Sequence, residues 1–203
     1  MPVGVLLAGG LARRMGGGDK ALRRLGGKTL LDHTIARLGP QVLELILNAN
    51  GDPARFADWN FPVIADPIPG RPGPLAGVLA GMRWVREHRP QIADIVTVPT
   101  DTPFLPDDLV ARLRAAREQA GAPIAVAASA GRLHPVVGLW PVRLAGALAR
   151  SLAAGERGVG AWALGQGAAT AVFDVAGLDP FSNFNRPEEL AAAERLFGVP
   201  PPA

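Results

Sequence analysis

The chain has 203 residues, of which 48% are hydrophobic and 19% are charged. This composition is typical of one compact domain with a full core, and it excludes a disordered chain. The chain has no cysteine, which excludes a disulfide framework and a thiolate metal site. The formal net charge is +3, and the arginines are scattered among acidic residues, so we expect no nucleic-acid partner.

The high isoelectric point of about 10.5 does not change that expectation. The chain has no tyrosine or cysteine to titrate in the alkaline range, and Lys20 and Lys28 are the only lysines among its 21 basic residues. The first apolar run is interrupted by Gly9-Gly10, and no run approaches the roughly 18 apolar residues of a membrane span. We therefore expect no membrane partner and a cytoplasmic location.

Buried strands and amphipathic helices are expected to alternate along the chain, starting with a strand at Val3–Leu7. The expected strands cover residues 3–7, 42–47, 61–65, 94–99, 124–128, 136–140 and 169–173, and the expected helices cover 29–38, 75–86, 106–119 and 187–197, with further helical segments after residue 141. This alternation predicts an α/β fold of the three-layer Rossmann-like type, in which helices cover both faces of a mostly parallel sheet. We expect residues 1–203 to form a single domain.

A loop of five glycines and three cations follows the first strand and ends at Lys20. Glycine lets backbone N–H groups approach an anion, and arginine and lysine supply the opposite charge. The loop therefore predicts a phosphate site at the carboxyl end of the sheet. It is not a Walker loop, because Ala21 stands where that pattern requires a hydroxyl, and Gly9-Gly10 lacks the spacing of the dinucleotide fingerprint.

Polar residues also follow three later strands. Asn48, Asp66 and Asp101 each stand at a strand end, and the ends of parallel strands meet at one sheet edge. Asp101 lies between Pro99 and Pro103 and offers hard oxygens suited to Mg²⁺, although it could instead cap a turn or the following helix. Asn48 could alternatively form an Asx turn, and Asp66 considered alone would be a turn residue.

The run from Leu7 to Lys20 resembles the signature Leu-Ala-Gly-Gly-x-x-x-Arg-Met-Gly-x-x-x-Lys of nucleotidyltransferases. With Asp19 before the lysine, it is similar to the molybdenum cofactor guanylyltransferase family. Further family motifs follow in the same order at residues 73–77, 101–106, 134–135, 155–157 and 182–190. The resemblance extends from Val3 to Leu196.

The resemblance implies a set of site residues. For GTP these are Leu7, Ala8, Gly9, Gly10, Gly16, Lys20, Asn48, Asp66 and Asp101; the candidate catalytic residues are Lys20, Asp101 and Arg14, with Mg²⁺ held by Asp101. Contacts to the second substrate are implied for His134, Arg157, Asn183 and Asn185, although His134 could be structural and Asn185 could be a helix N-cap. Residues 1–120 would then bind the nucleotide, and residues 121–197 would form the side of the second substrate.

The implied reaction transfers GMP from GTP to the terminal phosphate of molybdopterin or the molybdenum cofactor and releases pyrophosphate. Because that phosphate is already an anion, no general base is needed. Two alternatives remain: a related nucleotidyltransferase acting with CTP or a sugar 1-phosphate, and a non-catalytic GTP-binding carrier of the pterin. The Ala8-Gly9-Gly10 form of the loop favours guanine, and a carrier would not need Asp101. Proteins that hand over or receive the cofactor are further expected partners.

Overall fold

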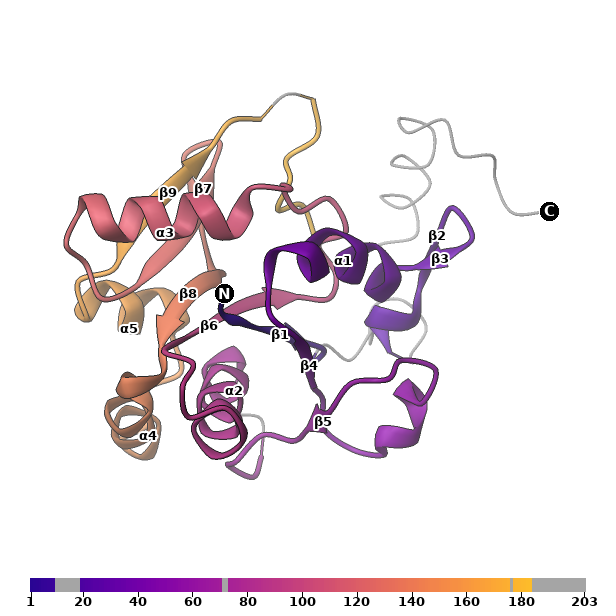
Figure 1. Cartoon of the computed structure of the whole chain (residues 1–203), viewed down its shortest axis with the longest axis horizontal. Coiled ribbons are helices and arrows are strands. Elements are labelled where there is room, and N and C mark those ends of the chain that lie inside the picture. Colours follow the sequence, from indigo (N-terminus) through magenta and orange to yellow (C-terminus); the bar gives the residue numbers. More distant parts are fainter. Residues whose placement is uncertain (10–18, 71–72, 176, 184–203) are drawn as a thin grey trace.

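The computed structural model describes residues 1–9, 19–70, 73–175 and 177–183. Within them, seven strands form one sheet in the order β5-β4-β1-β6-β8-β7-β9, with β5 and β9 at opposite edges (Figure 1). The strands are β1 (Val3–Leu7), β4 (Leu45–Asn48), β5 (Val63–Ile64), β6 (Asp94–Pro99), β7 (Ala125–Ser129), β8 (Arg132–Pro141) and β9 (Ala169–Phe173). Strands β5, β4, β1 and β6 pair in parallel, as do β7 and β9, whereas β8 is antiparallel to both of its neighbours. The predicted mostly parallel α/β fold is confirmed.

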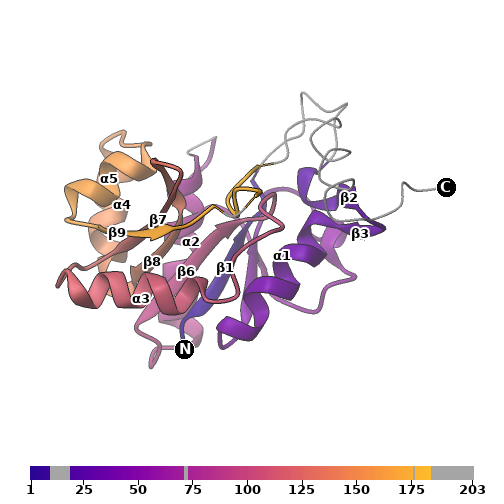
Figure 2. The same cartoon turned by 90° about the horizontal axis from the view of Figure 1, so that it is seen from above.

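The five helices of the described chain cover both faces of this sheet. They are α1 (Leu30–Leu38), α2 (Pro74–His88), α3 (Leu109–Gln119), α4 (Ala145–Ala153) and α5 (Val159–Gly165). Helices α1 and α3 lie on one face, and α2, α4 and α5 lie on the other (Figure 2). Each face of the sheet has its own apolar cluster. The cluster under α1 and α3 includes Leu31 and Leu113, and the cluster under α2, α4 and α5 includes Leu79 and Trp162.

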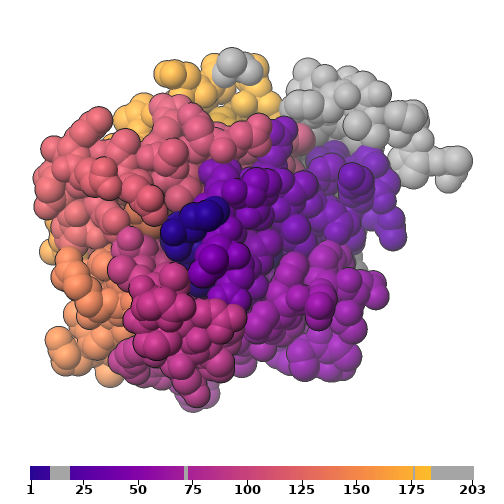
Figure 3. All heavy atoms as spheres, in the orientation of Figure 1, coloured from indigo at the N-terminus to yellow at the C-terminus, as the bar shows by residue number. Residues whose placement is uncertain are grey.

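The central strands carry continuous apolar sequence because both of their faces are buried. All five residues of β1 are buried, and a Cβ on Gly4 would lie 2.7 Å from the Cδ2 atom of Leu45. The glycine therefore permits the close packing of β1 against its neighbour. Met1 precedes this strand and is exposed; the N-terminal residues reach the surface in the middle of the face shown in Figure 3.

A small antiparallel hairpin precedes α1, where the sequence predicted only a turn. Its strands are β2 (Arg24–Leu25) and β3 (Lys28–Thr29), and Gly26 and Gly27 supply the positive φ angles of the turn, 57° and 82°. Thr29 then caps α1 in a reciprocal box with Asp32, whose backbone N–H donates to the threonine hydroxyl. The hairpin and cap together set the start of the helix that follows the glycine loop.

Other element boundaries shift by a few residues. Helix α3 starts at Leu109 rather than at Pro106, because residues 106–108 form a turn and Asp108 is the N-cap. Strand β8 begins at Arg132, so His134 lies inside the strand. The helix expected at residues 187–197 lies outside the described residues. None of the helices that the structure describes has the length and apolar character of a membrane span.

Candidate active site

A cavity of about 840 Å³ lies at the edge of the sheet where the parallel strands end. This volume is within the usual range for a small-molecule site. Its walls include these residues predicted from the sequence: Leu7, Ala8, Gly9, Lys20, Asn48, Asp66, Asp101, His134 and Asn183. The fold therefore collects into one cavity residues that are widely separated in the chain. Gly10, Arg14, Gly16 and Asn185, also predicted, lie outside the described residues.

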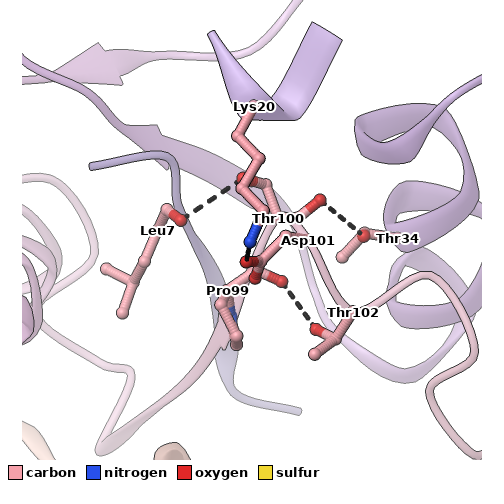
Figure 4. A network of polar contacts seen from close by, with 7 residues as sticks. All are labelled: Leu7, Lys20, Thr34, Pro99, Thr100, Asp101 and Thr102. Atoms are coloured by element: carbon pink, nitrogen blue, oxygen red, sulfur yellow. Dashed lines mark hydrogen bonds and ion pairs between the residues drawn. The ribbon is translucent and has the colours of Figure 1, made fainter. Parts of the chain in front are cut away.

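Lys20 and Asp101 form an ion pair in this cavity, between Nζ and Oδ2 (Figure 4). Lys20 opens the short 3₁₀ helix η2 (Lys20–Leu22), and Asp101 follows β6. Both side chains are largely buried, with 11% and 16% of their surface exposed. A charged pair at this depth is only weakly screened by solvent, so each group strongly affects a charge placed beside it.

The backbone that carries Asp101 is held on both sides. The Thr100 N–H donates to the carbonyl oxygen of Leu7 at 3.2 Å and extends the pairing between β1 and β6. The Thr102 hydroxyl donates to the carbonyl oxygen of Pro99 at 2.7 Å (Figure 4). Because Asp108 is the N-cap of α3, Asp101 does not cap that helix. Its carboxylate is left at the cavity wall beside Lys20.

A second polar pair lies where β4 and β5 end. The Asn48 amide donates to Asp66 Oδ1 at 3.0 Å and to the Ile64 carbonyl oxygen at 3.2 Å, so it links the two strand ends rather than forming a local turn. Asn50, which sequence reasoning missed, donates to Asp66 Oδ2 at 2.7 Å and accepts the backbone N–H of Asp66 at 2.9 Å. The Asp66 carboxylate is thereby held in place by hydrogen bonds to both of its oxygen atoms.

Arg55 is a further cavity residue that sequence reasoning missed. Its guanidinium forms an ion pair with Asp19, the residue immediately before Lys20. It also donates to the carbonyl oxygen of Asn50 at 2.6 Å and to that of Asp52 at 2.8 Å. Arg55 thus connects the end of the glycine loop to the segment that follows β4, a connection that no local sequence pattern indicates.

The glycine at position 77 allows helix α2 to approach the cavity residues Asn48 and Leu7. A Cβ there would lie 2.3 Å from Oδ1 of Asn48 and 2.6 Å from Cδ2 of Leu7. Both distances are shorter than real carbon contacts, so any larger residue would displace one of these side chains. Gly77 therefore helps to set the position of Asn48.

His134 lines the wall of the cavity formed by β8. Its Nε2 atom lies 2.7 Å from Oγ of Ser129, and its ring packs against Phe181 with a centroid separation of 4.9 Å. Burial lowers the pKa of His134; the charge of Asp179 opposes this shift, and that of Arg132 adds to it. The net shift favours a neutral ring at neutral pH.

Arg157 is not brought to the cavity wall in the described structure. Its guanidinium donates to the carbonyl oxygens of Leu152 at 2.8 Å and Glu156 at 2.6 Å, at the C-terminal end of α4. A cation is favourable there because the last carbonyl groups of a helix lack partners within the helix. The side chain therefore binds carbonyl oxygens at the end of α4 rather than pointing into the cavity wall. The backbone of Arg157 nevertheless lies near Gly73 at the cavity rim.

A sheet edge that combines a buried lysine–aspartate pair, an amide–carboxylate pair and a cavity of this size is that of a nucleotide-binding α/β protein. Residues 4–169 match the family described as the MobA-like NTP transferase domain. The chain belongs to this nucleotidyltransferase family, as the sequence predicted.

Curated relatives agree with this assignment. The molybdenum cofactor guanylyltransferase of Rhodopseudomonas palustris strain HaA2 is 57% identical over 96% of this chain and 92% of the relative. That of Bradyrhizobium sp. strain ORS 278 is 54% identical over 95% and 92%. Among solved structures, molybdopterin-guanine dinucleotide biosynthesis protein A from Archaeoglobus fulgidus superposes with a TM-score of 0.73 over 98% of this chain and 99% of that one, at 22% identity. The last likeness confirms the nucleotidyltransferase fold.

Proposed function

We propose that this chain transfers GMP from GTP to the terminal phosphate of molybdopterin or of the molybdenum cofactor. A pterin phosphate oxygen forms a bond to the α-phosphorus of GTP, and the bond from that phosphorus to the bridging oxygen breaks. The electron pair leaves with pyrophosphate. The observation that carries this proposal is the buried Lys20–Asp101 pair at the cavity wall, in a chain that is 57% identical to a guanylyltransferase.

The chemical difficulty of this reaction is electrostatic, because two anions must meet and negative charge must move to the leaving group. Lys20 would contact the triphosphate as a compact positive charge. Asp101 would hold Mg²⁺, because its carboxylate presents hard oxygen atoms at the cavity wall beside Lys20. Mg²⁺ characteristically uses one or two carboxylates, substrate phosphates and water. When bound, the ion would neutralise phosphate charge.

The nucleoside would lie against the ends of β1, β4 and β5. The Asn48 amide oxygen and the Asp66 carboxylate line the cavity there and offer acceptors to a base edge or ribose, because both N–H protons of Asn48 are already donated to Asp66 and Ile64. Gly9 would leave room for the nucleotide, because no atom of the described residues, its chain neighbours apart, lies within 4 Å of the position its Cβ would occupy. The second substrate would occupy the wall formed by β8, near His134 and Asn183.

Residues 1–120 would then form the nucleotide-binding part and residues 121–197 the second-substrate side of one domain. GTP is a cytoplasmic nucleotide, so the proposal includes a cytoplasmic location. A product that must reach other enzymes also implies protein partners that deliver molybdopterin or receive the dinucleotide.

Purified full-length protein mixed with molybdopterin, Mg²⁺ and each of the four NTPs tests this function. We expect pyrophosphate release with GTP and little with the other nucleotides. Each buried polar group left unpaired by the wrong base costs on the order of 1–3 kcal/mol. Equal turnover with CTP would instead identify a cytidylyltransferase. GTP binding without pyrophosphate release would identify a non-catalytic carrier.

A further inference from the structure

The hydroxyl of Ser129 lies between two ionisable side chains at the edge of the cavity. Ser129 ends β7 and is fully buried. Its Oγ atom is 2.7 Å from Nε2 of His134 and donates to Oδ1 of Asp179, also at 2.7 Å. Neither of these two contacts is needed for the reaction chemistry described above, so the arrangement requires a separate explanation.

The number of available protons determines the direction of these hydrogen bonds. A serine hydroxyl has one proton, and here it is donated to the Asp179 carboxylate. The same carboxylate oxygen accepts the backbone N–H of Phe181 at 2.9 Å. Oγ can therefore only accept from His134, so Nε2 carries a proton. In a neutral imidazole the other nitrogen, Nδ1, is then proton-free.

The Nδ1 atom keeps some exposure to solvent. It makes no hydrogen bond to any described residue, and it is not one of the fully buried side-chain atoms without a partner. His134 lines the cavity and keeps 12% of its side chain exposed. The polar edge that His134 presents to a ligand is therefore a hydrogen-bond acceptor.

We propose that Ser129 and Asp179 are positioning residues that fix His134 as its Nε2–H tautomer, so that Nδ1 accepts an N–H group of the second substrate. The assignment of that substrate as a pterin rests on the proposed function. A pterin is a flat heterocycle with N–H donors along its edges. Leu133, which also lines this wall and is 37% exposed, offers apolar surface for its face.

The ionisation of His134 supports this role. Protonation of the ring would convert Nδ1 from an acceptor into a donor. The lowered pKa, caused mainly by burial and opposed by Asp179, keeps the acceptor form present at neutral pH. Arg132, at the start of the same strand, acts in the same direction as burial.

Nitrogen-15 NMR of the histidine rings tests the tautomer directly. The chain has three histidines, and the other two are internal references. Nε2 of His33 faces the carbonyl oxygen of Leu25 at 2.8 Å, and Nδ1 of His88 faces that of Trp84 at 3.0 Å, so these rings should show opposite tautomers. We expect the signals that disappear in His134→Asn to show the Nε2–H form at neutral pH. An Nδ1–H ring or an imidazolium would overturn the proposal.

Steady-state kinetics tests the consequence for the substrate. Ser129→Ala should mix the tautomers of His134 and raise KM for molybdopterin roughly 3- to 10-fold, the effect of weakening one hydrogen bond, with KM for GTP unchanged. Asp179→Asn should act in the same direction, and Ser129→Thr should retain the wild-type value. Ser151→Ala is the matched control, because that hydroxyl accepts from Trp162 at 3.0 Å and is not part of the cavity wall.

A merely structural role for Ser129 would change KM for both substrates or for neither, and either result would overturn the proposal. The unchanged His33 and His88 signals report that each variant is folded. Failure of the proposed function would appear separately, as absence of GTP-dependent turnover in the wild-type protein. The NMR measurement would still decide the tautomer.

Discussion

The two sides of the cavity are constructed differently. The side proposed to bind the nucleotide, called the nucleotide side below, uses the carboxyl ends of β1, β4, β5 and β6, which all run in the same direction. The opposite wall uses the beginning of β8, which is antiparallel to β6. Pairing of Thr97 with Gly138 places the residues before Gly138 beside the carboxyl end of β6. An antiparallel strand thus contributes its first residues to the same edge.

This difference explains which side chains can be recognised from sequence. The rule that ligands bind at strand ends finds Asn48, Asp66 and Asp101, but it would search the wrong end of β8. The nucleotide side also presents charged and amide groups directly to the cavity. On the opposite wall, the exposed edge of His134 depends on a buried serine and on Asp179, which lies 50 residues from Ser129.

Replacing Asp101 by asparagine should have the largest effect on turnover, because it removes a charged group from the nucleotide side of the cavity. The change is nearly isosteric but removes the charge proposed to hold Mg²⁺, so turnover should fall on the order of 1,000-fold, corresponding to several kcal/mol of lost stabilisation. Pyrophosphate release, GTP affinity and thermal melting should be measured together. Turnover retained at an unchanged melting temperature would remove Asp101 from the mechanism.

Lys20→Ala should lower turnover by about 100- to 1,000-fold, by analogy with loss of one preorganised charge-stabilising group. Lys28→Ala is the matched control, because Lys28 is exposed in the β3 strand of the hairpin. It is the other lysine of the chain and should leave turnover unchanged. Similar rates for the two variants would mean that the glycine loop has been misinterpreted.

Gly77→Ala tests the packing behind the nucleotide side. The new Cβ would meet Asn48 and Leu7, so we expect a loss of about 1–3 kcal/mol of unfolding free energy. Displacement of Asn48 should also raise KM for GTP roughly tenfold, by about one hydrogen bond. Gly165→Ala is the control, because no described atom beyond its own helix backbone and chain neighbours lies within 4 Å of the new Cβ; it should neither lower the unfolding free energy nor raise KM for GTP. Urea unfolding and initial rates provide the comparison.

Arg55→Ala should raise KM for GTP several-fold, because Asp19, at the end of the glycine loop, would lose its ion pair with Arg55. We expect the free energy of GTP binding to weaken by about 1 kcal/mol. Arg37→Ala removes another ion pair, to Asp107, but one that is exposed and not part of the cavity wall. Such pairs contribute about 0–1 kcal/mol to stability, so GTP kinetics should not change. Equal KM values for the two variants would contradict the positioning of Asp19 by Arg55.

The smallest expected effect is a pH dependence of stability from the His134 wall. The pKa of His134 is lowered below 6.5 in the folded state, so unfolding takes up a proton between its folded pKa and 6.5. Stability should therefore decrease as the pH falls through this window, and His134→Asn should flatten the curve there. Asp32 titrates lower: burial opposes its charge, but hydrogen bonds from Thr29 and Trp59 prevail and hold its pKa below 3.8. Urea titrations at several pH values measure the difference.

Much of the fold could be predicted from sequence because its strands are simple apolar runs. The bounds of β1, β6 and β9 agree with the prediction. The hairpin of β2 and β3 was missed because strands of two residues show no periodicity. The family and the class of reaction are confirmed.

The missed site residues show the limit of that reading. Arg55 forms an ion pair with Asp19, and Asn50 donates a hydrogen bond to Asp66. The partners in each pair are distant in sequence, and only the folded chain brings them together. Conversely, the sequence predicted that Arg157 contacts the second substrate, whereas in the structure its guanidinium donates to a carbonyl oxygen at the end of α4. The roles proposed for the remaining site residues stay predictions.

The adjacency of β6 and β8 has a consequence for substrate geometry. Asp101 follows one of these strands and His134 lies on the other, and the two strands are joined by hydrogen bonds rather than by a hinge. Neighbouring strands keep a spacing of about 4.8 Å. The sheet therefore fixes the distance between the two sides of the cavity. In the proposed binding mode, a second substrate would be selected by whether its phosphate reaches the nucleotide when its ring system rests against β8, and the length of the substrate would then be part of the specificity.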